Sequence, residues 1–167
     1  MEIFQIKDGC YFGSSYFYFS DTNLDGIFGE KSRCHEGFSI EEDYVWGYLI
    51  TFINKYADRN FEYGDEKCFS KEIVGSICSD ILEVCNVIKS NFNDPSLDEF
   101  KKAISIFYFA SDEEIEKYDL RNKPNDEINK FIESRKERIL DFYNHFIERI
   151  TLLIDSSEKK KIHIHTP

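Results

Sequence analysis

The sequence predicts an α+β fold, predominantly α-helical, in which a small N-terminal β element packs on a bundle of four to five helices. Three observations support this prediction. Short aromatic and β-branched runs separated by turn residues fill residues 1–37. Apolar residues then recur at three- and four-residue spacing over residues 38–156. Aromatic residues make up 16% of the chain, which is enough large side chains to build one core.

The predicted β element consists of two short strands. Residues 3–6 and residues 11–19 are rich in Ile, Phe and Tyr, which favour extended structure. Asp8-Gly9 separates the two runs, and a cluster of Asp, Asn and Gly follows the second at residues 21–29. Such residues favour turns, so strand pairing is the natural prediction for this part of the chain.

The first predicted helix begins after Phe38. Ser39 and Glu42 have the spacing of a capping box, in which each side chain bonds to a backbone N–H near the start of the helix. Apolar residues then follow with a helical period at positions 40, 44, 45, 48, 49, 52, 53 and 56.

Four further helices are predicted downstream. One begins after Ser70 and runs to about residue 92. Capping-box spacing predicts two more, which begin at Ser96 and Ser111. The longest follows Pro124 and carries an apolar stripe in which Arg135 fills the one missing position. The stripe residues are Ile128, Ile132, Ile139, Phe142, Phe146, Ile150 and Leu153.

We expect a single domain over residues 1–167, with a β-rich part (1–37), a helical part (38–156) and a tail (157–167). The alternation Ile162-His163-Ile164-His165 allows a late strand in that tail, and the other possibility is a frayed end. The sequence shows neither a secretory signal nor a long apolar span, and its five cysteines lack paired metal spacing. A cytoplasmic protein with reduced thiols is therefore expected.

Charge is the strongest functional indicator. The chain holds 32 acidic and 21 basic side chains. Residues 1–120 hold 24 Asp and Glu against 11 Lys and Arg, a net charge of −13, whereas residues 121–167 have a net charge of +2. A field of this sign attracts basic partners and repels nucleic acid and anionic membranes. We therefore expect a protein partner, with no role in nucleic-acid or membrane binding.

Two acidic groups are the candidate partner-binding residues. The first crowds the start of the first predicted helix, where the helix dipole favours anions in any case. The second lies in a loop, where no helix start accounts for it, and it alternates with aromatic residues of the kind that anchor interfaces. Together the candidates are Glu41, Glu42, Asp43, Asp58, Glu62, Tyr63, Asp65 and Glu66.

Catalytic motifs are missing from the sequence. It contains neither a Gly-x-Ser-x-Gly elbow nor a glycine-rich phosphate loop, so we predict no catalytic residue, no cofactor and no enzyme. A small hydrolase that works with carboxylates alone is the alternative from another class. Cys68, Cys78 and Cys85 are expected to be buried as small apolar residues.

One segment resembles a calcium-binding loop. Asp21, Asn23 and Asp25 match its first three oxygen-ligand positions, and Gly26 matches its turn-making glycine. The twelfth position, which holds a bidentate Glu in such loops, is Ser32. We therefore predict no metal site, with a weak calcium-binding module on residues 21–32 as the alternative.

In general character the chain resembles the immunity proteins of bacterial contact-dependent and polymorphic toxin systems. These are small, acidic, aromatic-rich proteins without a catalytic signature. The most motif-like part is residues 28–37 (FGEKSRCHEG), which lead into residues 39–46 (SIEEDYVW). The resemblance implies a cytoplasmic antitoxin that neutralises one cognate toxin domain, often a basic nuclease, by forming a tight complex with it.

Overall fold

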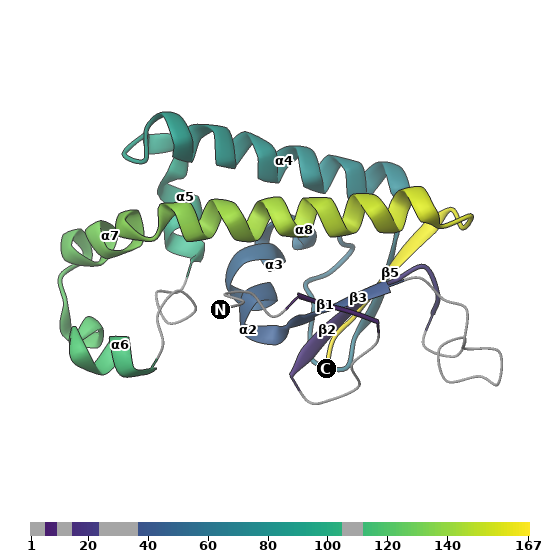
Figure 1. The fold of residues 1–167 in the computed structure, drawn as a ribbon, viewed down its shortest axis with the longest axis horizontal. Helices are drawn as coiled ribbons and strands as arrows, with labels where there is room; N and C mark the ends of the chain where they lie inside the picture. Colours follow the sequence, from purple (N-terminus) through teal and green to yellow (C-terminus); the bar gives the residue numbers. More distant parts are fainter. Residues whose placement is uncertain (1–5, 10–14, 24–36, 105–111) are drawn as a thin grey trace.

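A computed structural model describes residues 6–9, 15–23, 37–104 and 112–167 of the chain. It confirms the α+β class with helical structure predominant. Within these residues, five strands form one antiparallel sheet in the order β1-β3-β2-β5-β4. Helices α4 and α8 run side by side along one face of this sheet (Figure 1).

The sheet joins segments from both ends of the chain. Its strands are β1 (Ile6–Asp8), β2 (Tyr16–Ser20), β3 (Gly37–Glu41), β4 (Glu66–Ser70) and β5 (Lys161–His165). Of the two possibilities for the tail, the late strand is the one present, as β5, which pairs with β2 on one side and β4 on the other. As the last strand added along the chain, β5 closes the sheet, and β4 is left as an edge strand.

The predicted capping box at Ser39 is wrong. Residues Gly37–Glu41 form β3, which pairs with β1 on one side and β2 on the other. The Ser39 hydroxyl donates to the carbonyl oxygen of Gly9 at 2.9 Å and caps no helix. Phe38 and Ile40 alternate with Ser39 and are buried, so two-sided strand pairing and burial of these side chains outweigh the local helix signal. Likewise, β4 is a strand inside the part predicted to be helical.

The first helical stretch begins at Glu42 and contains a widened turn. It consists of α2 (Glu42–Tyr44), a π-helical turn η2 (Val45–Leu49) and α3 (Ile50–Asn54). The buried hydroxyl of Tyr143 donates to the carbonyl oxygen of Tyr48 at 2.9 Å, which satisfies a backbone acceptor in the wide turn. Turns of this kind occur often at functional sites.

The next helices begin close to the predicted positions. In α4 (Lys71–Ser90), the Ser70 side chain accepts a hydrogen bond from the N–H of Ile73 at 3.3 Å, as an N-cap should. The helix predicted to begin at Ser96 starts as a 3₁₀ turn, η3 (Pro95–Leu97), and continues as α5 (Asp98–Ala103). Its N-cap is Asp94, whose side chain accepts from the N–H of Ser96, and not Ser96 itself. The other short elements are α6 (Asp112–Lys117) and η5 (Leu120–Asn122). Ser111, predicted to open the fourth helix, lies outside the described residues.

The long C-terminal helix predicted from the apolar stripe is two helices. They are α7 (Asn125–Ser134) and α8 (Lys136–Ser156), and Arg135 between them has φ −104° and ψ 5°. The break falls at the one position where the stripe lacks an apolar residue. The α8 part of the stripe is buried in the core, at Ile139, Phe142, Phe146, Ile150 and Leu153.

Aromatic side chains join the sheet to the helices. Phe19 and Phe38 stack with ring centroids 5.1 Å apart, and Phe146 of α8 meets Phe19 edge-on at 5.6 Å. On β5, Ile162 and Ile164 face the same core. Among the described helices, none combines the length and the apolar character that a membrane span requires.

Candidate functional site

An aromatic pair connects the two acidic segments that the sequence singled out. The ring of Trp46, in η2, lies 5.4 Å from the ring of Tyr63, in the loop between α3 and β4. Beneath them, buried Phe17 contacts both Trp46 at 5.0 Å and Phe61 at 6.4 Å. Tyr63 is 70% exposed, so the pair presents a large aromatic side chain to solvent. We call Glu41, Glu42, Asp43, Trp46, Glu62 and Tyr63 the acidic–aromatic surface.

Negative charges crowd the helix-start side of this surface. Glu41 ends β3, and Glu42 and Asp43 open α2 directly after it. Partial burial raises the pKa of Glu41, and repulsion from Asp43 and Glu42 raises it further against the opposing attraction of Lys7. In the described part of the chain, Glu42 Oε2 finds no hydrogen-bond partner. The charges in this segment therefore oppose one another and are only partly compensated.

In the loop, by contrast, Asp65 is fully engaged with its own chain. Its carboxylate accepts hydrogen bonds from both terminal nitrogens of Arg59 at 2.9 and 2.7 Å. It also accepts a bond from the N–H of Glu62 at 2.8 Å. The bonds from Arg59, followed by the backbone bond, hold the pKa of Asp65 below its usual range. Such a bidentate pair fixes the shape of the loop.

Two more loop acids also have cationic or polar partners. Asp58 accepts from Lys67 Nζ at 3.2 Å and from the N–H of Arg59 at 2.9 Å, which lowers its pKa. Glu66 is the first residue of β4, and its Oε1 lies 2.8 Å from Nδ1 of His163. Asp58 and Glu66 are exposed as well but are engaged by these partners, so Glu62 and Tyr63 are the loop candidates that extend the acidic–aromatic surface.

A polar cluster that the sequence did not predict lies on the sheet face opposite the core. Its members are Cys68, Glu66 and His163, from neighbouring strands β4 and β5. Cys68 was expected to be buried but is exposed, because Lys67 and Phe69 on either side of it are the residues that turn inward. Strict alternation along each strand could have indicated which side chains share a face, but not that β4 and β5 pair and bring them together. The expected burial of the other two cysteines agrees better with the structure, since Cys85 is buried and Cys78 is half-buried.

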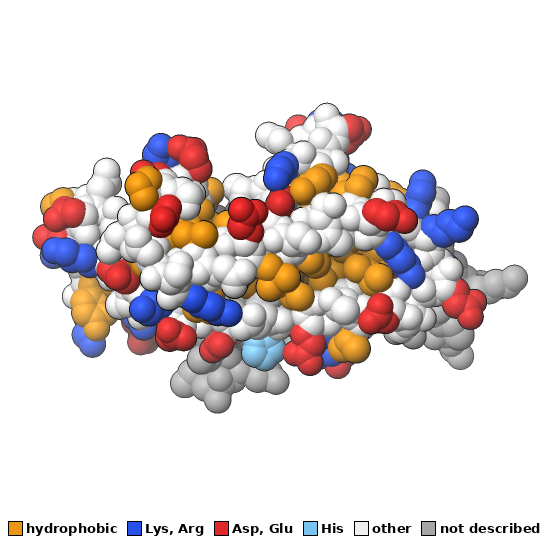
Figure 2. Space-filling view, turned by 90° about the horizontal axis from the view of Figure 1, so that it is seen from above, with side chains coloured by type: hydrophobic (Ala, Val, Ile, Leu, Met, Phe, Trp, Pro, Cys, Tyr) orange, Lys and Arg blue, Asp and Glu red, His pale blue; other side chains and the backbone are white. Residues whose placement is uncertain are grey.

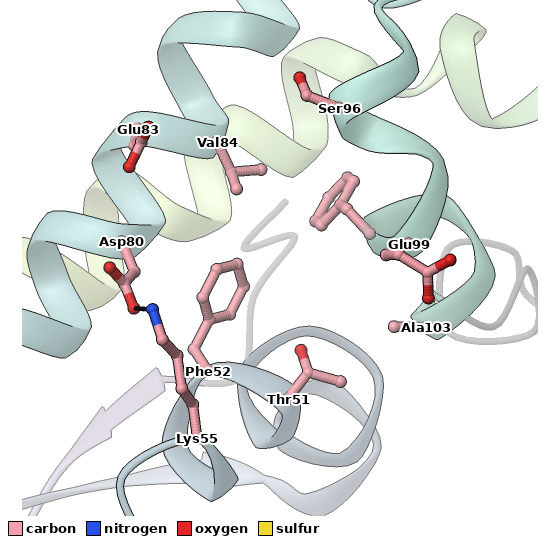
Figure 3. Close-up of a pocket in the computed structure, with 10 residues that line it drawn as sticks. Thr51, Phe52, Lys55, Asp80, Glu83, Val84, Ser96, Glu99 and Ala103 are labelled. Atoms are coloured by element: carbon pink, nitrogen blue, oxygen red, sulfur yellow. Dashed lines mark hydrogen bonds and ion pairs between the residues drawn. The ribbon is translucent and has the colours of Figure 1, made fainter.

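A groove of about 480 Å³ lies between α3, α4 and α5 (Figure 3). Phe52 and Phe100 form apolar walls, and Asp80, Glu83 and Glu99 bring carboxylates to it. Lys55 bonds to Asp80 at 2.6 Å and Lys102 bonds to Glu99 at 2.7 Å, so two of these charges are offset. The groove therefore combines apolar walls with carboxylates, most of which are paired with lysine.

The face formed by α4 and α8 differs from these acidic regions. Figure 2 shows acidic and basic side chains interspersed there, with hydrophobic side chains between them. Leu82 and Leu152 are exposed on these helices at 43% and 54%. Mixed charge of this kind favours solubility and gives little steering of a charged partner.

In the turn that resembles a calcium loop, the first carboxylate, that of Asp21, is bonded to other side chains of the protein. Asp21 is buried, and its oxygens accept from the hydroxyls of Ser157 at 2.8 Å and Thr22 at 2.9 Å. Asn23 follows in the described residues, whereas Asp25 and Ser32 lie outside them. Among the described side chains, no group of three or more His, Cys, Asp or Glu is arranged to hold a metal ion.

No family model, curated protein or solved structure matches this chain.

Proposed function

We propose that this chain is an acidic binding protein that neutralises a basic, nuclease-type bacterial toxin domain by forming a tight complex with it. The observation that carries the proposal is the charge crowding at Glu41–Asp43, next to exposed Tyr63, whose ring packs on half-buried Trp46. A cationic partner would relieve this repulsion, and Tyr63 would serve as the aromatic anchor.

The chemistry of such a partner complements this surface. A nuclease must bind the phosphate backbone, so it presents Lys and Arg around its active site. Carboxylates placed where phosphates bind would compete with the nucleic acid and would accelerate association through the opposite field. The remaining acids of the loop support the surface indirectly, because the Asp65–Arg59 pair holds the segment that carries Glu62 and Tyr63.

Co-expression with a toxin domain tests this proposal. The first step is to read the gene immediately upstream, which we expect to encode a large secreted protein with a variable C-terminal domain; that domain is then used. We expect the chain to abolish the toxicity of that domain in bacteria and to co-elute with it as a complex in size-exclusion chromatography. A toxic domain that stays toxic and elutes separately, or an upstream gene of unrelated kind, would contradict the proposal.

A further inference from the structure

The polar cluster on β4 and β5 brings together a thiol, an imidazole and a carboxylate. Cys68 is directly opposite His163 in the antiparallel register, and its Sγ lies 3.7 Å from His163 Nε2. On the other side of the same ring, His163 Nδ1 lies 2.8 Å from Glu66 Oε1. A nucleophile next to a base, with the base oriented by a third group, is the arrangement required for nucleophilic catalysis.

The hydrogen bonds fix the tautomer of His163 that this chemistry needs. A carboxylate accepts hydrogen bonds, so His163 donates to Glu66 through Nδ1–H and leaves Nε2 as an acceptor facing the thiol. Although Cys68 is exposed, partial desolvation by the side chains around it raises the pKa of its thiol, and Glu66 raises it further against the opposing effect of Lys161. The thiol is therefore protonated at neutral pH, and its activation requires the base beside it.

Neighbouring rings hold His163 in place. The imidazole of His165 stacks on that of His163 with centroids 6.0 Å apart, and Tyr18 stacks on His165 at 5.9 Å. His165 is buried and donates through Nε2 to the carbonyl oxygen of Thr22 at 3.2 Å. Its burial lowers its pKa, so it remains a neutral packing group next to the base.

The edge of the sheet provides a place for a substrate. A hollow of about 340 Å³ runs along β4, where Cys68 and Glu66 contribute to its wall. Phe69, Ile73 and Tyr56 give the hollow apolar walls, and Asp58 and Lys67 line it as well. With both apolar and charged side chains in its wall, the hollow suits a short acyl group such as acetyl.

A backbone donor lies at the same edge. Two backbone hydrogen bonds just beyond the ends of the β4–β5 pairing fix which residues face each other with a bond. The N–H of Lys71 donates to the carbonyl oxygen of Lys160 at 3.3 Å, and the N–H of Thr166 donates to that of Asp65 at 2.9 Å. Bonds in an antiparallel ladder alternate along the strand, so the N–H of Cys68 points away from β5, toward the open edge. A carbonyl oxygen that becomes negative during attack by the thiol would find a donor there.

From this geometry we infer that Cys68 is the nucleophile of an acyl-transfer site, with His163 as general base and Glu66 as positioning residue. The Cys68 proton passes to His163 Nε2 while Sγ bonds to the acyl carbon of an ester, and the bond from that carbon to the leaving alcohol then breaks. The alcohol takes the proton from His163. Water next attacks the thioester and gives a proton to His163, the C–S bond breaks, and the thiolate recovers the proton. This activity goes beyond partner binding and does not depend on it.

The experiment uses p-nitrophenyl acetate as the probe, with peptide mass mapping of the acetylated cysteine. We expect folded protein at pH 7 to gain one acetyl group on Cys68 at least about tenfold faster than the same cysteine in urea. Cys68→Ala should abolish this acetylation, His163→Gln should slow it about 100-fold, and Cys78→Ala should leave it unchanged. Acetylation of Cys68 at or below the rate in urea would overturn the inference, as would an equal rate in the folded His163→Gln variant.

Glu66→Gln separates positioning from a merely structural role. A Gln amide can donate to Nδ1 and so favour the tautomer whose Nε2 carries the proton, which cannot accept from the thiol. We expect a slower reaction at neutral pH and recovery of the wild-type rate at high pH, where the thiol ionises without a base. A loss of equal size at every pH would mean that Glu66 only maintains the fold, and the assigned role would be wrong.

Discussion

The two acidic regions, residues 41–43 and residues 58–66, carry similar charge but use it differently. In the loop, the Arg59 and Lys67 side chains lower the pKa of Asp65 and Asp58. At the helix start, burial and like charges raise the pKa of Glu41. Opposite shifts distinguish acids that already have an internal partner from acids that an external cation would stabilise. Charge that is only partly compensated, and not charge alone, is thus what supports the proposed binding surface.

The largest change in binding affinity is expected for a substitution at Tyr63. Tyr63→Ala removes the exposed ring that joins the two regions and should weaken binding to the toxin domain about 30-fold, the usual cost of losing an interface anchor of about 2 kcal/mol. Because the ring is 70% exposed, the melting temperature of the free protein should hardly change. Titration calorimetry and thermal melts measure the two quantities, and a stable variant with unchanged affinity would exclude Tyr63 as an anchor.

Asp65→Asn should lower the stability of the free protein more than it lowers affinity for the toxin domain. It removes the bidentate bond to Arg59, so we expect the melting temperature to fall by several degrees at pH 7. A lowered pKa means that the stabilisation is present above the ordinary Asp value of about 3.9 and is lost as the pH falls through the folded-state value. Variant and wild type should therefore converge in acid.

The matched control is Asp58→Asn. Asp58 bonds to Lys67, but its side chain is 89% exposed, and water competes for it. We expect a smaller loss than for Asp65→Asn in the same melts. Equal losses for both variants would mean that the loop is not held mainly by the Arg59–Asp65 pair.

The smallest effect is expected at Glu41, and it has the opposite sign. Glu41→Gln removes a repelled charge and should stabilise the free protein at pH 7 by less than about 1 kcal/mol. A raised pKa means that ionisation costs stability, so the gain should disappear as the pH falls toward the ordinary Glu value of about 4.3. The same variant should bind the toxin domain more weakly, and urea unfolding and binding rates would test both signs.

Much of this fold could be predicted because local and global signals agree. The cap at Ser70 and the stripe of α8 specify helices that the core then buries. Ser39 misled the prediction because its capping pattern is local, whereas β3 depends on pairing with β1 and β2 from elsewhere in the chain. The break between α7 and α8 at Arg135 left only one sign in the sequence, the missing apolar residue in the stripe.

The candidate site was predictable in composition but not in pairing. Acids and aromatics of the loop can be identified from the sequence, yet the bond of Asp65 to Arg59 depends on how the loop folds. The meeting of Cys68 with His163, 95 residues later, depends on the register of β4 with β5. Long-range pairing of this kind leaves no trace in local periodicity.

The rate of association with the toxin domain, measured against ionic strength, tests the proposed binding surface most directly. Asp43→Lys with Glu62→Lys reverses two exposed charges on that surface, and Glu148→Lys with Asp155→Lys makes the same change in net charge on exposed positions of α8. We predict that the first pair slows association at least about tenfold at low salt, with the difference shrinking at high salt, while the second pair has a much smaller effect. Equal slowing by both pairs would show that only net charge matters and would contradict the assignment of the acidic–aromatic surface.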